Sequence, residues 1–316
     1  MGYKNPVGRD NYLPSRFQAE FQELDYSPPE IVRSNEDILW AIERAREVFA
    51  HHGVKIRQGN SLDRFLANAS SRLRGKKDAA PSAKADDNYV AILAGLIIAF
   101  DDEPGIKTVL ERITGSDVAS SSRRQSPGKD MIWELTMLSN LRISAIASKI
   151  AEPDLGADFG SGDYGVACKK IYSENSVEKA LKKGITQIER ANLRGVVAIN
   201  LDDLITPANK ILYASSQEFF RHMMQDYISQ FIDRHRSTLT KYAPSDICDG
   251  YIIYASAIGY VLDTKQFLPI GVNSIYDPSG DGSEHHRRLD ALAKKLGNAD
   301  GLSDWVKKVG GKMENW

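Results

Sequence analysis

The sequence has few of the features that mark disulfide-rich, membrane-spanning or strongly basic proteins. Its 316 residues include only two cysteines, Cys168 and Cys248, which are too few for a disulfide scaffold and lack the spacing of a metal finger. We therefore expect a reducing, cytoplasmic setting. The 41 basic and 42 acidic residues leave a formal net charge of −1, which excludes a global basic field for nucleic acid. Any nucleic-acid binding has to use a local basic surface.

The chain also lacks a long hydrophobic run. Its most apolar stretch, from Tyr89 to Phe100, covers about twelve residues, whereas a membrane span needs roughly twenty. We expect this stretch to form a buried helix and the protein to have no membrane partner. The first residues, MGYKNPVGRD, contain no apolar signal core, so no secretion signal is expected.

The composition is that of a folded protein, with 42% hydrophobic and 26% charged residues, and a chain of this length can bury a full core. Residues 1–30 are predicted to be an irregular arm. Ser34 is a candidate helix N-cap, because apolar residues recur at helical spacing after it. We predict a helical N-terminal region over residues 1–125, with a polar linker at 75–87 and a Ser/Arg-rich loop at 115–129.

After residue 125 the pattern changes to alternating helices and strands. We predict a long helix at 130–150 and a hairpin of two strands, Asp154–Phe159 and Tyr164–Ile171, joined by a Gly-rich turn. The elements predicted after the hairpin are a helix at 177–192, a buried strand opened by Gly195, a helix at 214–236, strands at 250–262 and 267–272, and a helix at 286–296. This order predicts an α/β fold with a mixed sheet in one domain over residues 126–316.

The segment 152–170, EPDLGADFGSGDYGVACKK, contains the clearest chemical signal. Asp154 starts the first hairpin strand and Lys169 lies on the second. Because strand side chains alternate between faces, Ala167 and Lys169 project from the same face, and the hairpin brings Asp154 near them. Acidic groups and one lysine around a single point are the components of metal-assisted phosphodiester hydrolysis.

This arrangement resembles the PD-(D/E)xK, or restriction-endonuclease-like, nuclease superfamily over residues 130–200. The resemblance implies an α/β/α core with a mixed sheet and a Mg²⁺ cofactor, with Mn²⁺ as a substitute. It assigns Asp154 and position 167 to the metal, and Glu134 on the preceding helix to the same metal site. Lys169 would assist the attacking nucleophile. Gln187 matches a glutamine that the family carries on a later helix.

Position 167 departs from the family pattern. The family places its second acidic residue two positions before the lysine, and this sequence has Ala167 there. Alanine has no oxygen ligand to offer a metal. The protein is therefore either a degenerate, inactive member, or Ala167 is an engineered replacement of glutamate or aspartate. In both cases the sequence as given is expected to be catalytically impaired.

The resemblance also implies a function and partners. It implies an endonuclease that hydrolyses DNA, as the effector subunit of a bacterial antiviral defence or DNA-processing complex with a helicase, ATPase or sensor subunit. The alternative is a catalytically inactive nuclease-fold subunit that binds nucleic acid or a partner protein. A third possibility is an α/β protein unrelated to nucleic acid. Arg123, Arg124 and Lys129 are either contacts to the DNA backbone or part of a solvated loop.

Several of these residues also have ordinary explanations. Asp158 lies on the same strand and faces the same way as Asp154, so it is a rival for the metal aspartate. Glu134 is compatible with an exposed helix position, and Gln187 with a surface glutamine. Lys169 could end a solvated strand, but it lies within an apolar run, where a lysine needs a partner.

Two adjacent histidine pairs complete the candidates. The side chains of His51 and His52, and those of His285 and His286, are expected to diverge, which argues against a metal shared within either pair. Cys168 points to the strand face opposite Ala167 and Lys169, so we expect a core thiol.

Overall fold

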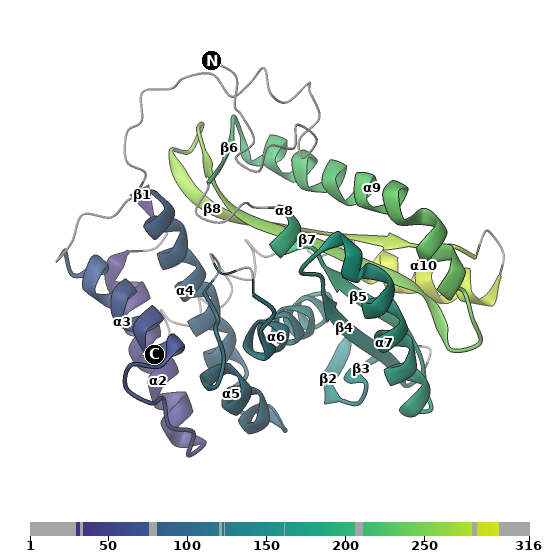
Figure 1. Ribbon diagram of the computed structural model, residues 1–316, viewed down its shortest axis with the longest axis horizontal. Coiled ribbons are helices and arrows are strands. Elements are labelled where there is room, and N and C mark those ends of the chain that lie inside the picture. Colours follow the sequence, from purple (N-terminus) through teal and green to yellow (C-terminus); the bar gives the residue numbers. More distant parts are fainter. Residues whose placement is uncertain are drawn as a thin grey trace.

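The computed structural model describes residues 30–31, 34–75, 81–119, 122, 124–160, 162–205, 211–279 and 283–296. The predicted α/β class is confirmed, since a mixed eight-stranded sheet lies between two layers of helices and a helical region precedes it (Figure 1). The strands are β1 (Glu30–Ile31), β2 (Ala147–Ala151), β3 (Asp154–Asp158), β4 (Tyr164–Lys170), β5 (Arg194–Asn200), β6 (Leu212–Ala214), β7 (Cys248–Val261) and β8 (Gln266–Tyr276).

The sheet combines antiparallel and parallel pairing. Its strand order is β1-β8-β7-β5-β4-β3-β2, with β6 paired to β7. Strands β2, β3 and β4 form an antiparallel meander, β4, β5 and β7 are parallel, and β8 returns antiparallel to β7. The segment predicted as a strand at 250–262 therefore extends the same sheet as the buried strand opened by Gly195, and adds no separate sheet.

Helices cover both faces of this sheet. Helices α7 and α9 pack on one face, whereas α6, α4 and α10 lie on the other (Figure 1). The helices with eight or more residues are α2 (Asn35–His51), α3 (Ser61–Leu73), α4 (Pro81–Ala99), α5 (Ile106–Thr114), α6 (Pro127–Ile143), α7 (Val177–Arg190), α9 (Gln217–Tyr242) and α10 (Glu284–Leu296). Two short helical turns, η1 (Glu174–Ser176) and α8 (Asp202–Ile205), follow β4 and β5.

The helical region shares its core with the sheet. Ser34 caps α2 as predicted, because its hydroxyl accepts from the backbone of Asp37 and the Asp37 carboxylate accepts from the backbone of Ser34. One continuous hydrophobic cluster joins the apolar sides of α2 to α6 with the α6-covered face of the sheet. The division into domains at residues 125 and 126 stays a prediction.

Several predicted boundaries are wrong, including that of the helix expected at 214–236, which spans Gln217–Tyr242. The helix expected over 130–150 ends at Ile143, because Ala145 adopts a left-handed backbone (φ +55°) and the next residues pair with β3 as strand β2. The linker expected at 75–87 ends early, since α4 begins at Pro81, a residue suited to a first helical turn. Lys129 lies inside α6 rather than in a loop.

The apolar run from Tyr89 to Phe100 belongs to α4 up to Ala99, and this helix packs against α2, α3 and α6. Within the part of the chain that the structure describes, no helix has both the length and the apolar character needed to cross a bilayer.

The close approach of β4 and β5 gives a test of this fold. A Cβ added at Gly195 would lie 2.1 Å from the backbone oxygen of Gly165, whereas one at Gly156 would meet its nearest atom at 3.6 Å. We expect Gly195→Ala to lower the free energy of unfolding by about 1–3 kcal/mol or more. The control Gly156→Ala should stay within about 1 kcal/mol of the wild type. Urea unfolding followed by circular dichroism measures both, and equal stabilities would contradict this close approach of the two strands.

Candidate functional site

Asp154 and Lys169 form a largely enclosed ion pair between β3 and β4. The Lys169 ammonium donates to Oδ2 of Asp154 at 2.6 Å, and the backbone N–H of Cys168 donates to the same oxygen at 2.8 Å. The ammonium also donates to the backbone oxygen of Cys168 at 2.6 Å. The side chains of Asp154 and Lys169 are only 13% and 10% exposed, so each charge depends on the other for compensation.

Gln187 joins this pair from α7. Its Nε2 donates to Oδ1 of Asp154 at 3.2 Å and to the backbone oxygen of Pro153 at 3.3 Å. Its Oε1 is buried and has no hydrogen-bond partner among the described residues. Helix α7 therefore holds the second oxygen of the Asp154 carboxylate, while β4 holds the first.

Ala167 lies on the same side of the sheet as Lys169. Its side chain is fully buried in the cluster under α7 and α9. Leu155 pairs with Val166, so one step further along the antiparallel register Ala167 lies across from Asp154. The position where the resemblance expects a second acid is thus directly beside the ion pair, but it carries only a methyl group.

Cys168 lies on the opposite face, in the cluster that includes α6. Burial raises the pKa of its thiol well above the ordinary value, and the nearby carboxylate of Asp154 raises it further. The thiol is free and buried, as expected for a core residue. The predicted alternation of side chains along β4 is confirmed.

Glu134 approaches the ion pair from α6. Burial raises the pKa of its carboxyl to about 8, the charge of Asp154 raises it further, and the charge of Lys169 opposes the shift. Glu134 is therefore mostly protonated at neutral pH, which makes it a hydrogen-bond donor rather than an anion.

Asp158 makes no described contact with Asp154, Lys169 or Gln187. It ends β3, is exposed, and its Oδ1 accepts from the backbone N–H of Gly160 at 2.8 Å in the hairpin turn. Of the two rival aspartates, the structure brings Asp154 to Lys169.

A second charged network, which sequence reasoning missed, borders the site at the ends of β4 and β5. The Lys170 ammonium donates to Asn200 at 2.7 Å and lies 3.2 Å from a carboxylate oxygen of Asp203. Lys129 also pairs with Asp203 and is 2% exposed, so it is not a surface contact for DNA. Of its two expected companions, Arg124 is exposed and Arg123 lies outside the described residues. The sequence offered one indication of this second network. Lys169 and Lys170 are adjacent on a strand, so their side chains point to opposite faces and need separate partners.

Helix α6 contributes a further carboxyl to this border. Tyr172 donates to Asp130 at 2.9 Å, and burial raises the pKa of Asp130 although the lysines oppose it. Asp130 precedes Glu134 by four residues, and this helical spacing places both carboxyls on one side of α6. That spacing was readable from the sequence.

These residues do not fit a Mg²⁺ site. Magnesium requires octahedral oxygen ligands and is usually held through one or two ionised carboxylates. Asp154 already accepts from Lys169, Cys168 and Gln187, and burial raises the pKa of Glu134, which favours the uncharged form of that carboxyl. Ala167 offers no oxygen. A metal ion beside Asp154 would need further negatively charged ligands. The group found beside Asp154 is instead the positively charged ammonium of Lys169.

The raised pKa of Glu134 predicts a loss of stability with increasing pH. The folded chain keeps this proton up to about pH 8, whereas the unfolded chain releases it near the ordinary value of 4.5. The folded state then binds more protons across that window, so the free energy of unfolding should fall by up to about 1.4 kcal/mol per pH unit. Glu134→Gln should remove this loss, and urea unfolding at pH 5, 7 and 9 measures it.

The control for this experiment is Glu189→Gln at an exposed position of α7. It should leave the pH dependence of the wild type unchanged. If Glu134→Gln and the wild type lose stability in parallel, Glu134 is ionised in the folded protein.

Comparison with protein-family models, with curated proteins and with solved structures finds no match to this chain.

Proposed function

We propose that this chain is a metal-dependent DNA endonuclease of the PD-(D/E)xK type whose cleavage chemistry is disabled by Ala167. One observation carries the proposal: side chains from β4 and α7 contact a single carboxylate of β3, and a carboxyl of α6 is electrostatically coupled to it. These side chains are Glu134, Asp154, Lys169 and Gln187. They occupy the positions that the resemblance to this superfamily assigns to its site.

The order of elements supports the same proposal. Helix α6 is followed by the meander β2-β3-β4, by α7 and by β5, which pairs parallel with β4. The resemblance implies a helix bearing a glutamate, a hairpin bearing the aspartate and lysine, a helix bearing a glutamine, and then a buried strand. An unrelated α/β protein has no reason to carry these four residue types on these elements, with three of them in contact and the fourth electrostatically coupled to them.

The residues present would handle a phosphate group rather than cleave it. The Lys169 ammonium can neutralise negative charge on a phosphodiester. Burial raises the pKa of Glu134, which lowers the repulsion that this carboxyl would exert on a nearby phosphate. No carboxylate faces the pair from position 167, so the donor set has no second acid to recruit a hard cation, and no cleavage step is available to it.

A second candidate function is a binding subunit that keeps the nuclease core without catalysis. The closed contact of Lys169 with both Asp154 and the Cys168 carbonyl favours it, because the charges of the site are balanced without any metal. The first candidate includes DNA as its ligand, whereas the second binds nucleic acid or a partner protein. A helicase, ATPase or sensor partner in a bacterial defence complex belongs to the proposal through the resemblance alone.

Restoring the acid tests the proposal. We expect Ala167→Glu to nick or linearise plasmid DNA in Mg²⁺ or Mn²⁺ and to lose this activity in EDTA. Adding Asp154→Ala or Lys169→Ala to that variant should abolish cleavage. Ala167→Gln is the matched control, because glutamine has nearly the same size as glutamate but carries no charge. This variant should stay inert. Thermal unfolding supplies a second readout: Mg²⁺ should raise the Tm of Ala167→Glu and leave that of the wild type unchanged.

The present sequence should bind DNA without cutting it. Gel-shift titration of the wild type should show binding that weakens as salt increases, since phosphate contacts release counterions. If folded Ala167→Glu stays inert in both metals while the wild type binds DNA, the binding subunit is the better description. If the wild type shows no DNA binding at low salt, the endonuclease proposal fails, and the second candidate remains only as a subunit that binds a partner protein.

A further inference from the structure

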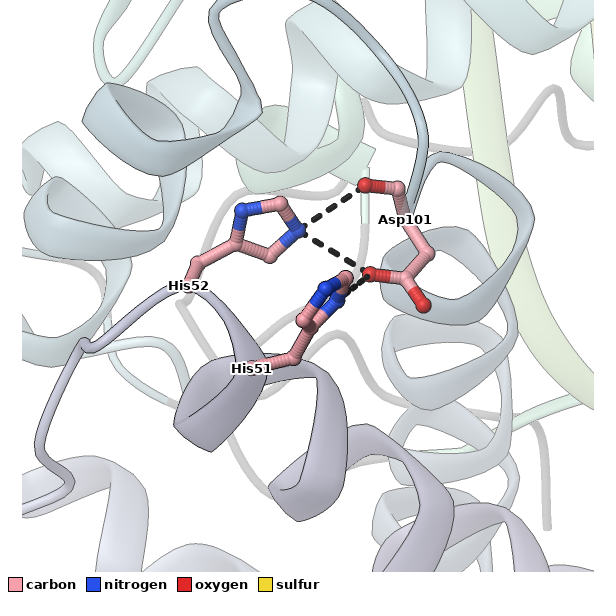
Figure 2. Close-up of side chains that lie close together, drawn as sticks. All are labelled: His51, His52 and Asp101. Atoms are coloured by element: carbon pink, nitrogen blue, oxygen red, sulfur yellow. Dashed lines mark hydrogen bonds and ion pairs between the residues drawn. The ribbon is translucent and has the colours of Figure 1, made fainter.

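A second group of chemically active side chains lies outside the candidate site, at the ends of two packed helices. His51 is the last residue of α2, His52 follows it as the C-cap, and Asp101 comes after the end of α4. Figure 2 shows the His51 ring directed at the Asp101 carboxylate, and the His52 ring directed at both that carboxylate and the Asp101 backbone oxygen, which lies 2.9 Å from its Nε2. Nδ1 of His51 lies 3.1 Å from Oδ1 of Asp101, and Nε2 of His52 lies 3.0 Å from the same oxygen.

This convergence corrects the expectation that the adjacent histidines diverge. Successive side chains on a regular helix point about 100° apart, which follows from its 3.6 residues per turn. His52 no longer belongs to the helix, and its backbone (φ −82°, ψ 5°) lets its ring turn towards its neighbour. The two ring centroids lie 4.8 Å apart. His285 and His286 behave as expected, because they contact two different carboxylates, those of Asp249 and Asp277.

The spacings between Oδ1 of Asp101 and the two ring nitrogens are close to those around a metal ion. Each of the three residues offers one atom, and these atoms all lie within 4.8 Å of one another. Zinc bonds of about 2.0–2.1 Å in a tetrahedron place neighbouring ligand atoms about 3.3 Å apart. Both contacts to Oδ1 of Asp101 are within a few tenths of an ångström of that spacing. Two imidazoles and a carboxylate are also a common donor set for zinc.

The surroundings hold the carboxylate in a suitable state and orientation. Arg44 contacts the other oxygen, Oδ2, at 3.4 Å, which leaves Oδ1 facing the two rings. Burial opposes ionisation of Asp101, but hydrogen bonds with His51 and His52 hold its pKa below the ordinary value. Asp101 and His52 are mostly enclosed, with 17% and 20% of their side chains exposed, while His51 is 65% exposed. An ion can therefore enter from the His51 side.

We propose that His51, His52 and Asp101 bind one divalent transition-metal ion, with Zn²⁺ the best match, through an N₂O ligand set. The ion would link the end of α2 to the end of α4, and these two helices already pack against each other. A fourth position would stay open to solvent beside His51. This proposal is independent of the nuclease function, because no residue of the Asp154 site takes part.

The experiment uses the full chain after removal of metal with EDTA and exchange into metal-free buffer. Titration with Co²⁺ should produce visible absorption bands that saturate at one equivalent and disappear when Zn²⁺ is added. Isothermal titration with Zn²⁺ measures the same site. We expect His52→Ala to weaken Zn²⁺ binding at least about tenfold, since one of three ligands is lost, and His51→Ala/His52→Ala to abolish it.

Controls separate this site from other metal-binding groups. His222→Ala removes an exposed histidine of α9 and should leave the binding unchanged. Asp154→Ala should also leave it unchanged, which excludes the nuclease-like site as the source of the signal. Asp101→Asn, which keeps the shape of the side chain, should weaken binding strongly even if a histidine double variant folds poorly.

The decisive outcomes are distinct. Zn²⁺ should raise the Tm of the wild type and not that of folded Asp101→Asn. A folded wild type with no Zn²⁺ binding at micromolar metal would show that the cluster is only a pair of histidine–carboxylate hydrogen bonds. Equal binding by the wild type and by Asp101→Asn would place the metal elsewhere. Either result overturns the proposal.

Discussion

The carboxylate of Asp154 is the group on which the candidate site depends. It accepts from the Cys168 backbone and the Lys169 ammonium with one oxygen, and from the Gln187 amide with the other. These bonds tie the start of β3 to the end of β4 and to α7. A carboxylate this enclosed would be costly without such partners. The same three bonds that stabilise the charge also aim Lys169 and Gln187 at one point.

The two faces of the central strand β4 carry side chains that belong to two separate charged networks. Ala167 and Lys169 face α7, where the ion pair lies, while Cys168 and Lys170 face α6. Lys170 is balanced by the acidic residues that follow β5, and Lys169 by Asp154. Two adjacent lysines can be buried in this way because each serves a separate network.

The helical region contributes to the site through shared packing. Helix α6 carries Glu134 and Asp130, and its apolar side belongs to the cluster that joins α2 to the sheet. Trp133, beside Glu134, stacks on Tyr254 of β7 at a centroid distance of 5.0 Å. The burial that raises the pKa of Glu134 is thus a consequence of how α6 is wedged between the helical region and the sheet. The histidine cluster lies at the far side of this same core, where α2 and α4 end.

Local rules were sufficient for much of this arrangement. The Ser34 cap, the hairpin around Gly160 and Gly162, and the opposite facing of Cys168 and Lys169 follow from side-chain chemistry and from the two-residue period of a strand. The α/β class followed from the order of helical and strand patterns. Each of these features depends on residues close together in the chain.

Long-range contacts decided the rest. Residues 147–151 form β2 instead of extending α6, because pairing with β3 supplies backbone hydrogen bonds that local periodicity cannot reveal. Lys129 is buried because Asp203, which lies far along the chain, compensates its charge. The pKa of Glu134 depends on the charge of Asp154 and on desolvation by the assembled core. His51 and His52 converge only because the end of α4 places Asp101 between them. Sequence alone determined which side chains each element offers; the tertiary structure decided which charges meet, because burial and electrostatic coupling exist only between groups that folding brings together.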